Sequence, residues 1–278
     1  MRYTNSFYYV LLFLLAFPLL AEDEVIVASE NEDSLPAHRL SMRDEITTLK
    51  KRSWRMGLNF SYSIDEEHRI ASAISNLALA NLKISLGLGS DTEIFGSMSY
   101  GYRSVETSLG ENVSDDSWSG LGTLRLGLKR TLRLEDATLP QFVASASVSL
   151  PMSDEAKKGG FANENWIGTI GLIAVKSIPP GFLIGGISYS DGLEENDASI
   201  GFQAGIGFAI THDLSLRFGV AGNKGLNGTE IASSGISSAF TTSVTYRIDE
   251  KITVEPYISI GMTEAQDATF GLSTILEF

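Results

Sequence analysis

Apolar and polar residues alternate one by one along most of the chain after residue 53. Between residues 252 and 262 the apolar positions share one parity, while Thr253, Glu255 and Tyr257 fall on the other. A period of two places apolar side chains on one face of a β-strand and polar side chains on the opposite face. The last run ends the chain on an aromatic residue, and its apolar positions are Phe270, Leu272, Leu276 and Phe278.

Twelve runs of this kind follow one another between residues 53 and 278. Tight gaps are expected at 89–91, 134–138, 177–180, 211–213 and 248–250, and longer gaps at 65–69, 104–117, 151–164, 190–198, 223–235 and 263–267. Transmembrane barrels have short periplasmic turns and longer outer loops, whereas a soluble sandwich does not sort its loops in this way. The sequence therefore predicts an all-β fold, a transmembrane antiparallel up-and-down β-barrel of about 12 strands with both termini periplasmic.

The first 21 residues have the layout of a cleaved secretory signal. Arg2 precedes an apolar run over residues 7–20 that Pro18 interrupts, and acidic residues follow Ala21. This run is too short for a permanent membrane helix. We therefore expect export from the cytoplasm, with the barrel in the cell outer membrane.

Residues 22–52 are expected to form a periplasmic linker that ends in a short helix over residues 40–53. Ser41 can cap this helix, and the bases of residues 50–52 suit the negative end of its dipole. So short a helix is marginal alone and must dock on another part of the protein. It could plug the lumen or mediate oligomerisation, or it could lie against the barrel rim as a lead-in.

The net charge of −13 disfavours nucleic acid as a partner. The six long gaps together hold 17 acidic and 4 basic residues, an excess that accounts for the whole net charge. Such an acidic outer rim could bind divalent cations that bridge lipopolysaccharide. Solvated loops are the commoner explanation of a charge run.

Enzymatic chemistry has no basis in the sequence. Cysteine is absent, so thiolate nucleophiles and thiolate metal sites are excluded. The three histidines, His38, His68 and His212, fall in the linker and in two connections between strands. A hydrolase triad or a histidine metal site would need them together on strands. We expect neither an enzyme nor a cofactor or metal site.

Charged residues on the polar parity are expected to line the lumen, because a basic side chain at the bilayer midplane on the lipid face costs about 2–4 kcal/mol. The candidates are Arg55, Lys83, Arg103, Arg125, Lys129, Arg217, Arg247, Glu93, Glu255 and Glu277. The excess of bases favours a narrow channel with a weak preference for anions. Alternatively, Glu93 and Glu255 pair with the bases and the network closes the lumen.

Several short strings resemble the transporter-like outer-membrane barrels named after the phenol meta-degradation pathway. They include residues 126–129, 139–140, 146–151, 174–180, 185–189, 254–256 and 271–273, within a resemblance that spans about 52–278. Met152 and Pro179 stand where the family often has Thr and Asp. The resemblance implies an outer-membrane channel or transporter. The chain is also similar, more distantly, to the twelve-stranded secretion pore for functional amyloid subunits.

Three functions remain open at this stage: a small-solute channel, a secretion pore for an amyloid-like polypeptide, and a non-conducting structural or adhesin-like barrel. The expected partners are outer-membrane lipid, lipopolysaccharide and an unidentified small solute, and a homo-oligomer is possible. The final strand is expected to act as the signal that the barrel-assembly machinery reads, through Phe270, Leu272, Leu276 and Phe278.

Overall fold

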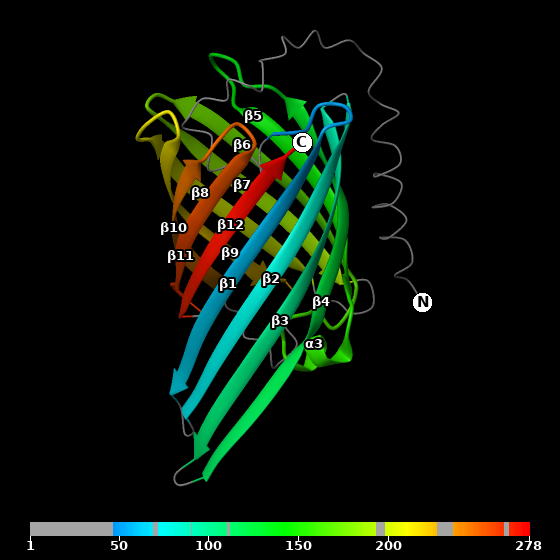
Figure 1. The fold of residues 1–278 in the computed structure, drawn as a ribbon, viewed down its shortest axis with the longest axis vertical. Coiled ribbons are helices and arrows are strands. Elements are labelled where there is room, and N and C mark those ends of the chain that lie inside the picture. The colour runs from blue at the N-terminus through cyan, green and yellow to red at the C-terminus, as the bar shows by residue number, and fades with distance from the viewer. Residues whose placement is uncertain are drawn as a thin grey trace.

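The computed structural model describes residues 47–68, 72–89, 91–109, 112–192, 198–226, 236–263 and 267–278. In this part of the chain, twelve antiparallel strands form one closed barrel, in which each strand pairs with its neighbours in sequence and β1 pairs with β12 (Figure 1). The predicted fold, an antiparallel barrel of twelve strands, is confirmed. The expected signal over residues 1–21 and most of the linker lie outside the described residues.

The first four strands are long and the other eight are short. The long strands are β1 (Trp54–His68), β2 (Ser72–Gly89), β3 (Thr92–Leu109) and β4 (Asn112–Arg133). The short strands are β5 (Gln141–Pro151), β6 (Ile167–Ile178), β7 (Gly181–Gly192), β8 (Ser199–Ala209), β9 (Leu214–Gly225), β10 (Ile236–Arg247), β11 (Ile252–Gly261) and β12 (Ala268–Glu277).

Large apolar side chains point outward all around this barrel. Phe60 is 54% exposed, Leu126 52% and Ile187 64%, and their neighbours in sequence face the interior. Because the ring of strands is closed, its backbone groups pair with one another and leave no sheet edge, as hydrocarbon surroundings require. The described residues contain no helix that is both long and apolar enough to cross a bilayer.

The two ends of the barrel differ. We call the end with Trp54, Phe278 and the connections at 90–91, 134–140, 179–180, 210–213 and 248–251 the turn end, and the opposite end the loop end. The eight short strands have 10–12 residues, close to the length that crosses a bilayer, whereas β1 to β4 have 15–22. The extra length of these four strands projects beyond the rest of the loop end (Figure 1).

The loops predicted at residues 65–69 and 104–117 were wrong, because most of these residues continue the strands. Asp65 pairs with Ser75, and Val105 pairs with both Ser75 and Asp116. Outside the bilayer, backbone pairing holds strands together without an apolar face, so the pattern there gave no sign of a strand. Long gaps and short gaps therefore do not alternate in the first two hairpins.

The helix expected over residues 40–53 is not present in its described part. Residues 47–50 are irregular and a turn follows at Lys51 and Arg52, where Arg52 has a positive φ of 71°. A different short helix, α3 (Asp154–Lys158), lies in the connection between β5 and β6. Ser153 caps α3 by accepting a hydrogen bond from the Ala156 N–H.

Candidate functional site: the lumen of the barrel

A cavity of about 820 Å³ lies inside the loop-end half of the barrel. Eleven of the 22 described residues that line it carry hydroxyl or amide side chains, and these come from β5 to β10 and from the connection after α3. These polar lining residues are Ser145, Ser149, Asn163, Thr169, Ser188, Ser190, Ser199, Gln203, Asn223, Ser237 and Ser238. Among the described residues that line the cavity, Arg125 is the one charged side chain, and none is acidic.

Arg125 is held in a fixed orientation on β4. Its Nε donates a hydrogen bond to Ser147 Oγ at 2.9 Å, and its Cζ lies 5.8 Å from the centre of the Phe95 ring. The ring rests on Gly127, where an added Cβ would lie 2.6 Å from Phe95 Cζ. The guanidinium is therefore supported on one edge and one face while it lines the cavity.

Lys83, on β2, contacts the same aromatic ring. Its Nζ is 5.0 Å from the centre of the Phe95 ring. In the register of β2, β3 and β4, both Lys83 and Arg125 pair with Ser97. The strands thus bring two of the predicted lumen bases to one level of the wall and into contact with one phenyl ring, as cation–π interactions favour.

Glu93, Lys129, Arg55 and Glu277 form a charge cluster near the turn end. Glu93 is fully buried, and its Oε2 lies 3.3 Å from Lys129 Nζ and 3.8 Å from Arg55 Nη1. Arg55 Nε is 2.7 Å from Glu277 Oε1. Two acids balance two bases in this cluster, as buried charges require. Removal of one partner from such a group generally lowers the free energy of unfolding by about 3–5 kcal/mol. These bases contribute no net positive charge to the lumen.

Residues 47–50, which we call the strap, are bound to this charge cluster. The Leu49 N–H donates to Glu93 Oε2 at 3.2 Å, and Leu49 itself is 5% exposed. Lys129 Nζ donates to the Thr47 carbonyl at 2.6 Å, and Arg55 Nη2 donates to Thr47 Oγ1 at 3.0 Å. The strap therefore lies inside the mouth of the barrel and not on its outer rim.

The strap fits because β2 carries a glycine beneath it. A Cβ at Gly87 would lie 2.0 Å from the Lys50 carbonyl oxygen and 2.6 Å from the Leu49 carbonyl oxygen. Two backbone hydrogen bonds continue the contact, from Arg52 N–H to the Gly87 carbonyl at 3.0 Å and from Gly87 N–H to the Ser53 carbonyl at 2.9 Å. The strap and the wall thus pack backbone against backbone.

The lumen on the other side of the turn end is also filled. Val175, Phe182 and Ile184 form a buried apolar cluster against Ile173, and an added Cβ at Gly207 would lie 2.1 Å from the Phe182 ring. Lumen-facing hydroxyls at this level are buried as well, namely Ser215, Ser243, Thr245 and Thr253. Among the described residues, the open space therefore belongs to the middle and the loop-end half of the barrel.

The structure separates the remaining predicted residues along the lumen. Arg217 and Glu255 line a second cavity of about 180 Å³. Arg247 lies at the turn end, where its Nη2 donates to the His212 carbonyl at 3.0 Å and its Nε is 3.3 Å from Asp213 Oδ1. Arg247 therefore anchors a turn and does not face the cavity.

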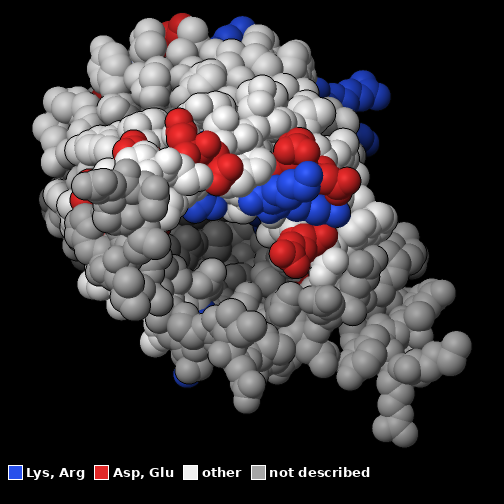
Figure 2. Space-filling model, turned by 90° about the horizontal axis from the view of Figure 1, so that it is seen from below, with Lys and Arg blue, Asp and Glu red and all other residues white. Residues whose placement is uncertain are grey.

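Arg103 connects the loop-end wall to the segment around α3. Its Nε donates to Ser75 Oγ and its Nη1 to the Gly159 carbonyl, both at 2.9 Å. Beside it, Phe161 fills a space above Gly101, where an added Cβ would lie 2.5 Å from the phenyl ring. Residues 152–166 are thereby folded against β3 and β4. Seen from below, the loop end has a hollow with acidic and basic side chains gathered along one side (Figure 2).

The last strand closes the barrel through backbone and aromatic contacts. Phe278 stacks on Trp54 with ring centres 4.3 Å apart. The Phe278 N–H donates to the Trp54 carbonyl at 2.9 Å, and the Trp54 N–H donates to the Phe278 carbonyl at 3.1 Å. Phe270, Leu272 and Phe278 are each about half exposed on the outer face, and Leu276 pairs with Met56.

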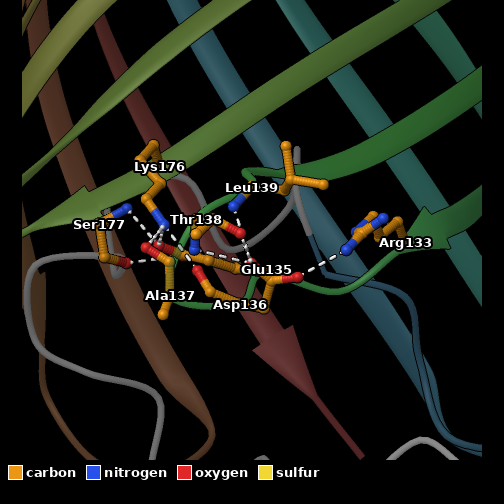
Figure 3. Close-up of polar contacts among 8 residues, drawn as sticks. All are labelled: Arg133, Glu135, Asp136, Ala137, Thr138, Leu139, Lys176 and Ser177. Atoms are coloured by element: carbon orange, nitrogen blue, oxygen red, sulfur yellow. Dashed lines mark hydrogen bonds and ion pairs between the residues drawn. The ribbon is translucent and has the colours of Figure 1, made fainter.

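The turn between β4 and β5 is held by ion pairs and hydrogen bonds at the turn end (Figure 3). Glu135 accepts hydrogen bonds from the Ser177 N–H and hydroxyl at 2.8 and 2.9 Å, and Lys176 Nζ lies 3.4 Å from its Oε1. The Leu139 N–H, Arg133 and Thr138 all donate to Asp136, and they hold the pKa of its carboxyl well below the usual range. These contacts fix a turn and create no site.

Solved structures with the same fold are outer-membrane barrels, and no protein-family model matches the chain. The COG4313 outer membrane channel from Pseudomonas putida F1 aligns with a TM-score of 0.62 and 15% identity over 84% of this chain and 98% of that one. The translocator domain of the autotransporter NalP from Neisseria meningitidis aligns with a TM-score of 0.55 and 9% identity over 86% and 93%. The NanC porin reaches 0.51 at 10% identity over 80% and 100%. The shared property is the barrel fold.

Sequence reasoning did not identify the residues that position the lumen bases. Phe95 and Ser147 were assigned no role. Phe95 has the same parity as Glu93 and Ser97, and this parity could have indicated that its ring faces the lumen. The register of β6, uncertain from a run that is apolar on both parities, is set in the structure with Ile170 and Leu172 facing outward. The described residues contain no group of three or more His, Cys, Asp or Glu that could hold a metal ion.

Proposed function

We propose that the protein is an outer-membrane channel that passes small solutes through a weakly anion-preferring lumen. One observation carries this proposal: half of the described residues that line the cavity of about 820 Å³ carry hydroxyl or amide side chains, and Arg125 is the one charged residue among them. A polar wall keeps the lumen wet, and a single fixed cation lowers the electrostatic barrier for anions. The paired cluster around Glu93 explains why the preference is weak.

The proposal includes an orientation. The turn end, with Trp54 and Phe278, faces the periplasm, and the loop end with its extended hairpins faces outward, because barrels of this class have short periplasmic turns. Outer-membrane lipid surrounds the apolar exterior, and lipopolysaccharide meets the long strands β1 to β4. The barrel-assembly machinery recognises β12 through the apolar side chains of one face, Phe270, Leu272, Leu276 and Phe278.

A planar bilayer under a KCl gradient tests the preference for anions. Refolded full-length protein should give a reversal potential displaced toward the chloride equilibrium potential, and Arg125→Gln should move that potential toward zero. Arg133→Gln is the matched control, since Arg133 lies on the same strand but is exposed and paired with Asp136 at the turn. Cation selectivity of the wild-type channel would contradict the proposal.

A further inference from the structure

We propose that Arg125 and the hydroxyls beside it form a binding site for small hydroxylated carboxylates, of the sugar-acid type. This inference rests on the proposed function and names the class of solute. Its starting point is the guanidinium of Arg125, whose Nε is occupied by Ser147 Oγ at 2.9 Å and whose Cζ lies 5.8 Å from the centre of the Phe95 ring. These contacts hold the side chain before any ligand arrives.

A supported arginine suits a carboxylate better than a spherical ion. Its planar fork of N–H groups matches the two oxygens of a carboxylate, and the resulting charge-assisted hydrogen bonds are about twice as strong as neutral ones. Because Ser147 and Phe95 already restrict the side chain, less conformational entropy is lost on binding. Lys83, whose Nζ also lies over the Phe95 ring, adds positive potential at the same level of the wall.

The rest of the cavity suits hydroxyl groups. Ser149 on β5 pairs in register with Arg125 on β4. Ser145 lies on β5 as well, and Thr169 lies on the next strand, β6. Serine and threonine hydroxyls both donate and accept hydrogen bonds, so they can pair with a sugar hydroxyl that acts as donor or as acceptor. The volume of about 820 Å³ also lies within the usual range for sites that hold small molecules.

The test uses block of the chloride current by gluconate, with sorbitol and acetate as matched probes. In full-length protein, gluconate should block at a lower concentration than acetate, and sorbitol should block least. Arg125→Gln should raise the half-blocking gluconate concentration about tenfold, the effect of losing one hydrogen bond to a charged group. Arg125→Lys keeps the charge but loses the fork and should lie between the two. Arg133→Gln should behave as wild type.

Calorimetric titration of the refolded protein with gluconate makes the result independent of conductance. Binding heat in the wild type that is lost in Arg125→Gln supports the site even if no current is seen, and in that case it is the proposed channel function that fails. An anion-selective current that gluconate does not block, without binding heat, would overturn the site and leave the channel function standing. Equal binding of gluconate and acetate would overturn the role of the hydroxyls.

A second inference rests on different residues. We infer that the strap, residues 47–50, narrows the turn-end mouth and that the charge cluster on Glu93 holds it there. Glu93 Oε2 accepts from the Leu49 N–H, Lys129 binds the Thr47 carbonyl, and Thr48 Oγ1 lies 3.3 Å from Thr131 Oγ1. The neighbouring lumen-facing hydroxyls and the apolar cluster on Phe182 are buried at the same end.

Gly87→Ala displaces the strap selectively, because its Cβ would lie 2.0 Å from the Lys50 carbonyl oxygen. Gly57→Ala is the matched control on the adjacent strand, where the nearest atom to an added Cβ is Lys83 Cβ at 3.8 Å. The chain has no cysteine, so Leu49→Cys provides a single thiol at a buried position of the strap.

Maleimide should label Leu49→Cys slowly, and about tenfold faster when Gly87→Ala is added, the effect of losing about 1.4 kcal/mol of docking free energy. Gly57→Ala should leave the rate unchanged. Single-channel conductance of Gly87→Ala should exceed that of the wild type. Unchanged conductance together with faster labelling would show that the strap moves without narrowing the mouth, and unchanged labelling would show that the strap is not packed against Gly87 inside the mouth. Either result overturns the inference.

Discussion

At the scale of single residues, the turn residue Asp136 illustrates how one exposed carboxylate can organise a connection. The Leu139 N–H and the Thr138 N–H donate to its Oδ1 at 2.7 and 2.8 Å, and Arg133 lies on its other oxygen. Donors on both oxygens favour the charged form, which is why the pKa of Asp136 is lowered. The negative charge therefore contributes to the stability of the folded turn.

We predict that Asp136→Ala lowers the free energy of unfolding in detergent at neutral pH and that the deficit shrinks in acid. Because the folded-state pKa is depressed, the contribution is fully present above the unfolded pKa of about 3.9 and is lost as pH falls toward the lower folded value. Urea unfolding curves of both proteins at several pH values between neutral and acid measure this. A deficit that grows as pH falls would contradict the assignment.

At the same scale, alternation along β2 and β4 was enough to place Lys83 and Arg125 on the polar face. It allowed Glu93 to pair with lumen bases, but it could not indicate that these are Lys129 and Arg55, because that choice depends on the register of four strands and on the path of residues 47–50. A count of charges alone would also overstate the preference for anions. Such a count gives Lys129 and Arg55, whose charges are balanced by acids, the same weight as Arg125.

At the scale of elements, the segment around α3 is the part of the loop end that the sequence pattern described least well. It was expected to be a plain loop, yet Ser153 caps a helix, and Phe161 is held by contacts that only the folded wall of β3 and β4 provides. The same limit applies to the extended hairpins, because strand pairing in water does not require a period of two. The alternating pattern that an apolar outer face imposes on the strands could be predicted from the sequence. The contacts of the α3 segment and of the extended hairpins, which have no such face, could not.

Gly101→Ala should release the segment around α3, because the added Cβ would lie 2.5 Å from the Phe161 ring and 2.9 Å from Leu79. We expect faster trypsin cleavage after Lys157 or Lys158, since proteolysis follows the population of the opened segment. Trypsin should cleave Gly185→Ala at the wild-type rate, because no atom lies within 4 Å of the added Cβ at this position. Equal rates for both variants would contradict the packing role of Phe161.

The final strand supports a further prediction at this scale. Deletion of Phe278 removes its stacking on Trp54 and two backbone hydrogen bonds that close the barrel. The stacked pair alone contributes about 1 kcal/mol, so the yield of folded barrel on refolding into detergent should fall. Phe278→Leu keeps the backbone hydrogen bonds, so its yield of folded barrel should fall less than that of the deletion. If both variants fold with wild-type yield, the contact does not contribute to closure.

At the scale of the whole molecule, one half of the barrel is largely filled by side chains and the other half is open. The buried residues are concentrated at the turn end, in the charge cluster with the strap and in the apolar cluster on Phe182, while the cavity opens in the loop-end half. The longer strands β1 to β4 extend this open half beyond the ends of the other eight strands (Figure 1). In the channel that we propose, solutes enter the open half freely and the turn end limits their passage.

Solute flux into proteoliposomes tests the central claim most directly. Vesicles that contain refolded full-length protein should take up labelled gluconate faster than protein-free vesicles, and Gly87→Ala should increase the rate because its mouth is released. Sorbitol should enter more slowly than gluconate. Uptake no faster than in protein-free vesicles, by both the full-length protein and Gly87→Ala, would contradict the assignment of this barrel as a solute channel.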